Sequence, residues 1–144
     1  MNVEAILRTK GDKIVTIAPD ATVGEAAHVL KRSRIGALVV SENDADVQGI
    51  LSERDIVGGL GDAASRKDLL DRPVRDLMTR DVLTCSPDDT VQHCMAVMTE
   101  HRVRHLPVMR DGRMVGVISI GDVVKNRLEE LENEAGFLRN LIAS

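Results

Sequence analysis

The chain contains one sequence pattern twice, and this duplication limits the folds available to it more than any other feature. Residues Val15 to Val23 are echoed by Leu83 to Val91, a separation of 68 positions (83 − 15), with the Thr, the Pro-Asp pair and the Thr-Val ending kept. Each copy closes on Ser-x-x-Asp followed by two β-branched aliphatic residues. A site built by one copy should therefore recur in the other, so a weak motif can be checked against its partner.

Composition disfavours two classes of partner, nucleic acids and membranes. The 144 residues carry a net charge of −4 and a single aromatic residue, Phe137. Nucleic-acid binding is disfavoured, because there is neither a basic field for phosphates nor a set of rings on which bases could stack. No run approaches the roughly 20 apolar residues that span a bilayer, and the segment from Met1 to Ala5 does not resemble a signal peptide. We expect no membrane partner and a cytoplasmic location.

Periodicity predicts the same elements in both copies. Apolar residues at i, i+3, i+4 and i+7 form one buried helical face, written as Val23, Ala26, Ala27 and Leu30 and again as Val91, Cys94, Met95 and Met98. Short strands are expected before each helix and, after it, at residues 37–40 and 49–52 in the first copy and at 106–109 and 116–119 in the second. A second helix should begin at each Ser-x-x-Asp. The predicted class is a mixed α/β (α+β) fold of two β-α-β-β-α repeats.

The predicted boundaries divide the chain into three parts. The first repeat with a hinge occupies residues 1–70, the second repeat 71–128, and a C-terminal amphipathic helix 129–144. The hinge is expected at the glycine cluster Gly58 to Asp62 and the polar stretch to Lys67, followed by a helical lead-in at 74–78 whose counterpart is 3–7. The glycines are a weak match to a phosphate loop, because they follow a helix and lack the Gly-Lys-Ser/Thr ending.

The C-terminal helix carries a heptad stripe. Its apolar residues are Val124, Leu128, Leu131, Ala135, Leu138 and Ile142. Phe137 and Leu141 add apolar surface beside the stripe. Two interpretations remain open, in which the stripe packs back on the same chain or pairs with a second copy in a homodimer.

The repeated Ser-x-x-Asp has a structural and a functional interpretation. Ser52 with Asp55, and Ser119 with Asp122, can form capping boxes that satisfy the free amides at the start of a helix. The same groups suit a nucleotide, because the helix start attracts phosphate and an acidic residue can accept hydrogen bonds from ribose hydroxyls.

These segments resemble the tandem cystathionine-beta-synthase (CBS) domain pair over roughly residues 1–128. The resemblance rests on the paired Gly-x-x-Ser-x-x-Asp, on the leading Thr16 and Thr84, and on the segment from His101 to Val108. It implies two repeats packed about a pseudo-two-fold axis, with two clefts between them that bind adenosine compounds. Family members regulate an attached enzyme or channel or act alone as sensors, and often pair as dimers.

The resemblance also implies roles for individual residues. Asp55 and Asp122 would hold ribose hydroxyls, Ser52 and Ser119 would lie near phosphate, and Ile35 and Val103 would flank adenine. The two clefts should differ, because Arg104-His105 stands where the first copy has Gly36-Ala37, and Gly121 where it has Arg54. The arginine and histidine should favour a phosphate-rich ligand. The complete candidate set is Thr16, Ile35, Gly36, Ala37, Ser52, Arg54, Asp55, Thr84, Val103, Arg104, His105, Pro107, Ser119, Gly121 and Asp122.

Three classes of function compete. The favoured one is a regulatory module for signal transduction that binds AMP, ADP, ATP or NAD(H) and acts on an effector protein that the sequence does not identify. The alternative is a dimerising adaptor with vestigial pockets. An enzyme is disfavoured because no nucleophile lies beside a base, and a zinc site from His93, Cys94 and His101 lacks the close spacing of such sites. No catalytic cofactor or resident metal is expected.

Overall fold

The computed structural model describes residues 1–11 and 14–143 and divides into two compact units. One unit combines residues 1–12 with 84–110 and 116–144, so it holds the second repeat. The other combines residues 13–83 with 111–115, so it holds the first repeat. Each N-terminal lead-in therefore belongs to the unit of the opposite repeat.

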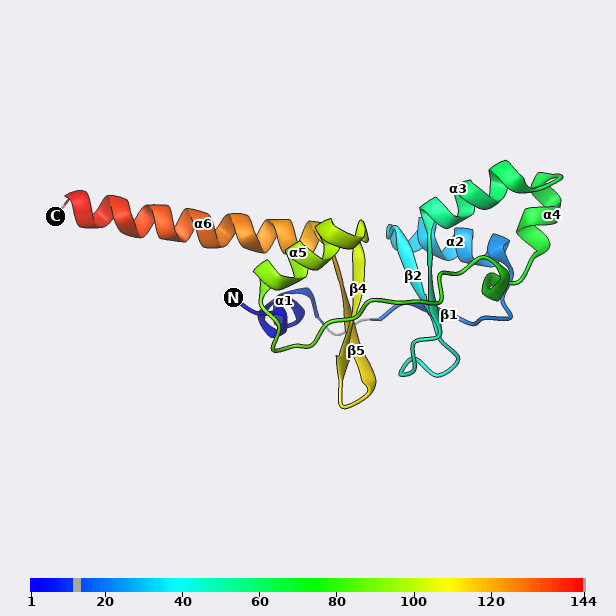
Figure 1. The fold of residues 1–144 in the computed structure, drawn as a ribbon, viewed down its shortest axis with the longest axis horizontal. Coiled ribbons are helices and arrows are strands. Elements are labelled where there is room, and N and C mark those ends of the chain that lie inside the picture. The colour runs from blue at the N-terminus through cyan, green and yellow to red at the C-terminus, as the bar shows by residue number, and fades with distance from the viewer. Residues whose placement is uncertain (12–13, 144) are drawn as a thin grey trace. The chain divides into compact units, whose positions relative to one another are not determined.

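The unit of the first repeat contains a three-stranded sheet in the order β1-β2-β3. Strand β1 (Thr16–Ile17) runs parallel to β2 (Ala37–Val40), and β2 pairs antiparallel with β3 (Gly49–Ser52). Helix α2 (Val23–Ser33) joins β1 to β2, and β3 leads into α3 (Glu53–Asp62), α4 (Arg66–Asp71) and the short 3-10 helix η1 (Val74–Asp76). Figure 1 shows this order along the colour gradient.

The core of this unit confirms the predicted helical face. Ala26 and Leu30 of α2 pack against Leu38, Val40 and Leu51 of the sheet, all of them buried. The sixth buried member of the cluster is Val74, which comes from the lead-in of the second repeat. The first repeat therefore needs a segment that precedes the second repeat to complete its core.

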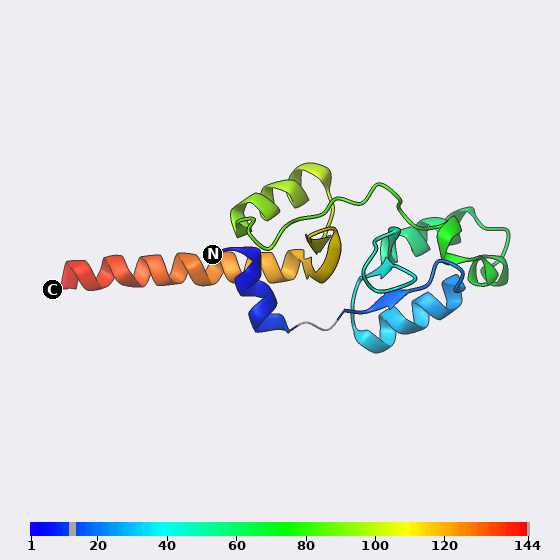
Figure 2. The ribbon, with the colours of Figure 1, turned by 90° about the horizontal axis from the view of Figure 1, so that it is seen from below.

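The unit of the second repeat contains α1 (Val3–Lys10), α5 (Val91–His101), β4 (His105–Arg110) and α6 (Ile120–Ala143). Strand β5 (Arg113–Ser119) forms a hairpin with β4, and residues 116–119 belong to this unit, whereas residues 111–115 belong to the unit of the first repeat. Both turn residues of the hairpin, Asp111 and Gly112, have positive φ, as tight two-residue hairpin turns require. Helix α6 contacts α5 and α1 (Figure 2), and its C-terminal half extends beyond them. The second repeat's last helix and the predicted extension are thus one continuous helix.

The strand expected before α5 is reduced to one bridge, between Cys85 and Val108. The first repeat makes two pairings here, because Thr16 lies opposite Val39 and the next residue opposite Val40. Position 39 corresponds to Pro107, which has no amide hydrogen to donate. The second pairing is therefore unavailable, although the Pro107 carbonyl still accepts the Cys85 amide at 3.0 Å.

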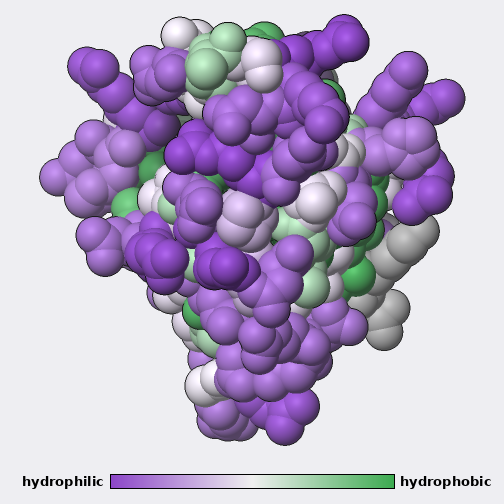
Figure 3. All heavy atoms as spheres, turned by 90° about the vertical axis from the view of Figure 1, so that its right-hand side faces the viewer, coloured by the Kyte–Doolittle hydropathy of each residue, from purple (hydrophilic) through white to green (hydrophobic). Residues whose placement is uncertain are grey.

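The predicted hinge at the glycine cluster is wrong. Residues 58–62 form the C-terminal half of α3, and residues 66–71 form α4. The helix starts from a complete Ser52 and Asp55 capping box. The helix continues through Gly59, which lets it pack closely on Leu69 and Leu77, since a β-carbon there would come within 2.9 Å of both side chains. The face bearing α3 and α4 is mainly hydrophilic (Figure 3).

No helix in residues 1–11 and 14–143 combines the length and apolar character that crossing a membrane requires.

The contact between Gly49 and the second lead-in gives a stability test. A β-carbon at Gly49 would lie 2.6 Å from the Met78 sulfur and 2.9 Å from the Thr79 carbonyl oxygen, and a carbonyl cannot turn away as a side chain can. We expect Gly49→Ala to lower the free energy of unfolding by about 1 to 3 kcal/mol. The matched control is Gly58→Ala in α3, where nothing lies within 4 Å. Urea unfolding followed by circular dichroism should show that the control gains about 0.5 to 1 kcal/mol.

Candidate functional site

The candidate site is built at two equivalent places, the start of α3 and the start of α6. In the first repeat the Ser52 hydroxyl accepts the Asp55 amide at 3.2 Å, and Asp55 Oδ2 accepts the Ser52 amide at 2.9 Å. In the second repeat the Ser119 hydroxyl accepts the Asp122 amide at 3.2 Å, and Asp122 Oδ2 accepts the Ser119 amide at 2.9 Å. The capping interpretation of both segments is therefore confirmed.

Capping uses only one oxygen of each carboxylate. In both repeats the bonded oxygen is Oδ2, and within residues 1–11 and 14–143 no hydrogen bond reaches Oδ1 of Asp55 or Asp122. Both side chains are half-buried. A capping carboxylate of this kind is held rigidly by its own helix and keeps a second oxygen for another donor, such as a hydroxyl group.

The residues before the middle strands are held beside these helix starts. The Gly36 carbonyl accepts the Glu53 amide at 2.9 Å, and the Arg104 carbonyl accepts the Ile120 amide at 2.8 Å. In the first repeat the register also places Ala37 opposite Ser52. The structure thus brings 35–37 to 52–55 and 103–105 to 119–122, each within one compact unit.

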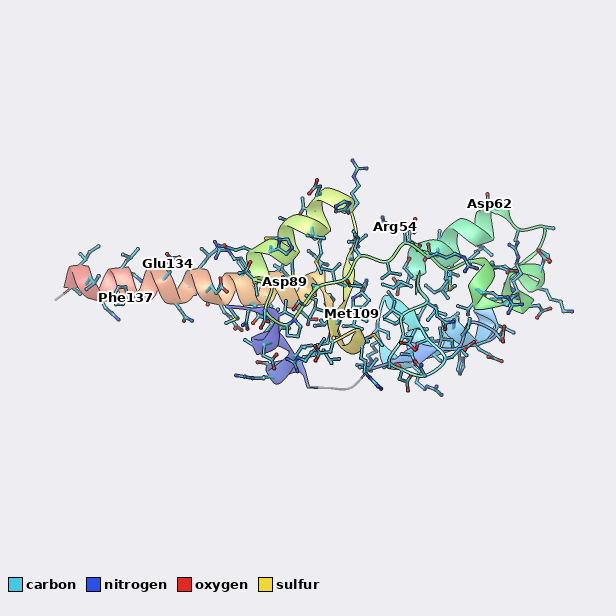
Figure 4. All side chains as sticks on the ribbon, turned by 60° about the horizontal axis from the view of Figure 1, so that its bottom comes forward. Arg54, Asp62, Asp89, Met109, Glu134 and Phe137 are labelled. Atoms are coloured by element: carbon cyan, nitrogen blue, oxygen red, sulfur yellow. The ribbon has the colours of Figure 1, made fainter. Side chains whose placement is uncertain are left out.

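The side chains at these positions differ between the repeats as the sequence predicts. Arg104 is exposed, and the first repeat has a glycine, Gly36, at the corresponding position. Arg54 is likewise exposed, at the second residue of α3 (Figure 4), where the second repeat has Gly121. Each repeat therefore presents one arginine near its helix start, from a different element. Ile35, Val103 and His105 are half-buried.

The two leading threonines are not equivalent. The Thr16 hydroxyl donates to Asp44 Oδ1, in the loop between β2 and β3 where Asp44 has positive φ. Thr16 lies opposite Val39, two residues along β2 from Ala37, so the register does not set it directly against Ser52. Thr84 is exposed, and among residues 1–11 and 14–143 its hydroxyl makes no such bond to Asp111, the aspartate with positive φ in the turn between β4 and β5. Pro107 is buried, and its carbonyl accepts the Cys85 amide.

Lys10 is a neighbour of the candidate site that no sequence motif indicates. Lys10 Nζ donates to Asp122 Oδ2 at 2.7 Å and to the Val117 carbonyl at 2.9 Å. Burial acts to raise the pKa of Asp122, but the hydrogen bond and charge of Lys10 together with hydrogen bonds from Ser119 hold that pKa below its ordinary value. No local pattern could reveal this pair, because 112 residues separate its members.

The two cysteines lie in the core of their unit, where Cys94 belongs to the predicted buried face of α5. Cys85 and Cys94 are both buried and free, and they hydrogen-bond to each other. That hydrogen bond and burial raise the pKa of the Cys85 thiol far above its ordinary value. Within the described residues, no group of three or more His, Cys, Asp or Glu side chains could hold a metal ion.

Comparisons with known proteins identify the repeated unit. The CBS domain family model matches residues 3–62 and 74–129. A CBS-domain containing protein from Agrobacterium tumefaciens is 42% identical, with a TM-score of 0.83 over 88% of this chain and 99% of that protein. A CBS domain protein from Pyrobaculum aerophilum, solved in complex with AMP, is 27% identical, with a TM-score of 0.74 over 85% of this chain and 89% of that one.

A third structure carries two other adenosine compounds. The CBS domain pair of protein MJ0100, solved with 5′-methylthioadenosine and S-adenosyl-L-methionine, is 25% identical, with a TM-score of 0.75 over 87% of this chain and 98% of that one.

The Lys10 contact predicts how the stability that Asp122 contributes depends on pH. Asp122 has a folded-state pKa below the ordinary 3.8, so its stabilising effect is complete above that pH and is lost as the pH falls through the lower folded value. We expect Lys10→Met to raise the pKa of Asp122 and to weaken the loss of stability on acidification. Carboxyl-carbon NMR titration measures the first effect, and urea unfolding at a series of acidic pH values measures the second. An Asp122 pKa that does not move in the variant would contradict the assigned cause.

Proposed function

Because this chain belongs to the CBS domain family, we propose that it is a regulatory module that binds adenosine nucleotides at its two repeated helix starts. The observation that carries the proposal is the shared geometry of Asp55 and Asp122, where one carboxylate oxygen caps the helix and the other has no hydrogen bond from a described residue. Relatives solved with AMP, or with 5′-methylthioadenosine and S-adenosyl-L-methionine, support adenosine as the shared part of the ligand.

The proposed roles follow from the chemistry of each group. Asp55 and Asp122 would accept hydrogen bonds from ribose hydroxyls, and Ser52 and Ser119 would lie near phosphate at the helix starts. The half-buried Ile35 and Val103 would contact the adenine ring, while Arg54, Arg104 and His105 would meet the phosphates. The ligands to be tested are AMP, ADP, ATP, NAD, NADH and S-adenosyl-L-methionine.

The proposed action is regulatory and not catalytic. Ligand occupancy would change the equilibrium between arrangements of the protein, and an effector protein would respond to that change. A ligand can move such an equilibrium only by the difference between its affinities for the two arrangements. Tight binding alone would therefore produce no signal.

The proposal predicts a stabilising ligand whose binding depends on both carboxylates. A ligand at a hundred times its dissociation constant should add about 2.7 kcal/mol to the free energy of unfolding, which thermal shift detects. For a ligand identified by such a thermal shift, Asp55→Ala and Asp122→Ala should each weaken binding at their own site roughly ten- to a hundredfold, as expected for the loss of a charged hydrogen bond. Titration calorimetry measures this loss.

A matched control separates binding from capping. Glu25 closes the capping box of α2 with Thr22, in the same arrangement as the two candidate boxes. Glu25→Ala should therefore lower stability as the aspartate variants do and leave ligand affinity unchanged. If both aspartate variants bind with unchanged affinity, their carboxylates serve only as caps. If none of the six compounds shifts the melting temperature, the adaptor interpretation is favoured.

We further propose that α6 pairs with a second copy of the chain. The heptad stripe does not pack back on its own chain, since Leu128, Leu138 and Ile142 are 55%, 54% and 86% exposed. Phe137, on the same distal part of the helix, is also exposed (Figure 4). A regular apolar stripe of this length favours burial against another helix.

This pairing predicts a dimer in solution that one charge disrupts. Light scattering after gel filtration should give twice the mass of 15.7 kDa for the parent chain. Leu131→Glu places a charge in the stripe and should produce a monomer, because an unpaired charge would be buried at the contact. The matched control is Asn133→Glu, which adds the same charge two positions along, outside the stripe, and should leave the dimer intact. A parent chain that runs as a monomer at micromolar concentration would refute the pairing.

A further inference from the structure

Lys10 reaches the candidate site of the second repeat from outside that repeat. It is the last residue of α1, and its side chain bridges the end of β5 and the first turn of α6 through Val117 and Asp122. Its place follows from the packing of α1, because Leu7, one turn earlier, fills the space beside Gly116. A residue three positions later on the same helical face then lies beside Val117.

Among residues 1–11 and 14–143, no cation takes the corresponding place beside Asp55 in the first repeat. The carbonyl that corresponds to that of Val117 belongs to Ile50, and it accepts the Thr79 backbone amide at 2.8 Å. At this carbonyl the second lead-in thus donates a backbone amide, whereas α1 donates the ammonium group of a lysine. No ion pair to Asp55 occurs among residues 1–11 and 14–143, whereas Lys10 and Asp122 form one at 2.7 Å.

The pair changes the charge that a ligand would meet. A lone carboxylate carries a full negative charge and repels phosphate, whereas a carboxylate paired with an ammonium group is close to neutral at a distance. Lys10 bonds to Oδ2, the oxygen already used for capping, so it leaves Asp122 Oδ1 for a hydroxyl. An ammonium group also has three hydrogens, and only two are used here.

We propose that Lys10 is a specificity-determining residue that makes the second repeat favour phosphate-bearing adenosine compounds over uncharged ones. In the first repeat no described cation lies beside Asp55, so its preference for phosphate-bearing over uncharged adenosine compounds is weaker. This inference rests on the proposed function and deepens it, because it assigns different ligand charges to two sites of similar backbone geometry. The side chains of Lys10 and Asp122 are 40% and 26% exposed, so the effect is moderate and sensitive to salt.

The test compares AMP with adenosine, which differ by the phosphate. Titration calorimetry is carried out in the Asp55→Ala background, so that the Asp122 site dominates the measured binding. Lys10→Met should reduce the ratio of AMP affinity to adenosine affinity about three- to tenfold, and Lys10→Arg should retain it. Raising the salt to about 0.5 M should shrink the difference between parent and variant, because screening weakens it. The control is Lys67→Met, which removes an exposed lysine paired with Asp71 in the first repeat's unit and should leave the ratio unchanged.

The outcomes separate this inference from the proposed function. If Lys10→Met weakens AMP and adenosine by the same factor, or changes neither, Lys10 has only a structural role and the inference is overturned. If the parent chain binds neither compound nor any other adenosine nucleotide, the proposed function falls and the inference falls with it. Circular dichroism checks the fold of each variant, and Lys10→Gln repeats the test if Lys10→Met does not fold.

Discussion

The structure depends on the exchange of lead-in segments between the two repeats. The amides of Val3 and Glu4 donate to the carbonyls of Asp89 and Pro87, and the amide of Val91 donates to the carbonyl of Met1. The second lead-in makes the same set of three bonds on the first repeat. They run from Val74 to Ala21, from Arg75 to Pro19 and from Val23 to Arg72, at 2.8 to 3.0 Å. Each lead-in therefore docks on the Pro-Asp turn and the helix start of the other repeat, and the duplicated Pro-Asp-x-Thr-Val segment is the surface that receives it.

Much of the fold could be predicted from the sequence because its determinants are local. The capping box of Thr22 and Glu25, the tight turn at Asp111 and Gly112 and the two Ser-x-x-Asp helix starts each depend on residues within four positions of one another. The glycine cluster misled the prediction because propensity disfavours glycine in a helix, whereas at Gly59 the helix packs closely against two leucines from later in the chain. Tertiary contact outweighs local propensity there, and no window of the sequence contains both partners.

The candidate site likewise has a part that could be predicted from local sequence and a part that could not. The backbone pairing of serine and aspartate could be predicted because the helix itself imposes it. The partners that make the repeats unequal could not, since Thr16 meets Asp44 across a loop and Asp122 meets Lys10 across most of the chain. Duplication therefore predicts the shared scaffold of the two sites but not their differences. These differences arise where the lead-ins and the loops between strands have diverged in length.

The exchange of lead-ins also accounts for the inequality of charge at the two sites. Because α1 is fixed to the second repeat at its start by three backbone bonds, about two turns of helix lead from that point to Lys10, whose side chain reaches Asp122. The second lead-in is fixed in the same way but contains only the three-residue helix η1 and continues into a bridge between Thr79 and Ile50. The bridge occupies the carbonyl of Ile50 with a neutral amide, and no cation from the described part of the chain pairs with Asp55. A change in the length of one docked segment has thus altered the electrostatics of a site that belongs to the other repeat while leaving the backbone of that site unchanged. Two sites with the same hydrogen-bonding scaffold can in this way acquire different ligand preferences without any substitution in the scaffold itself.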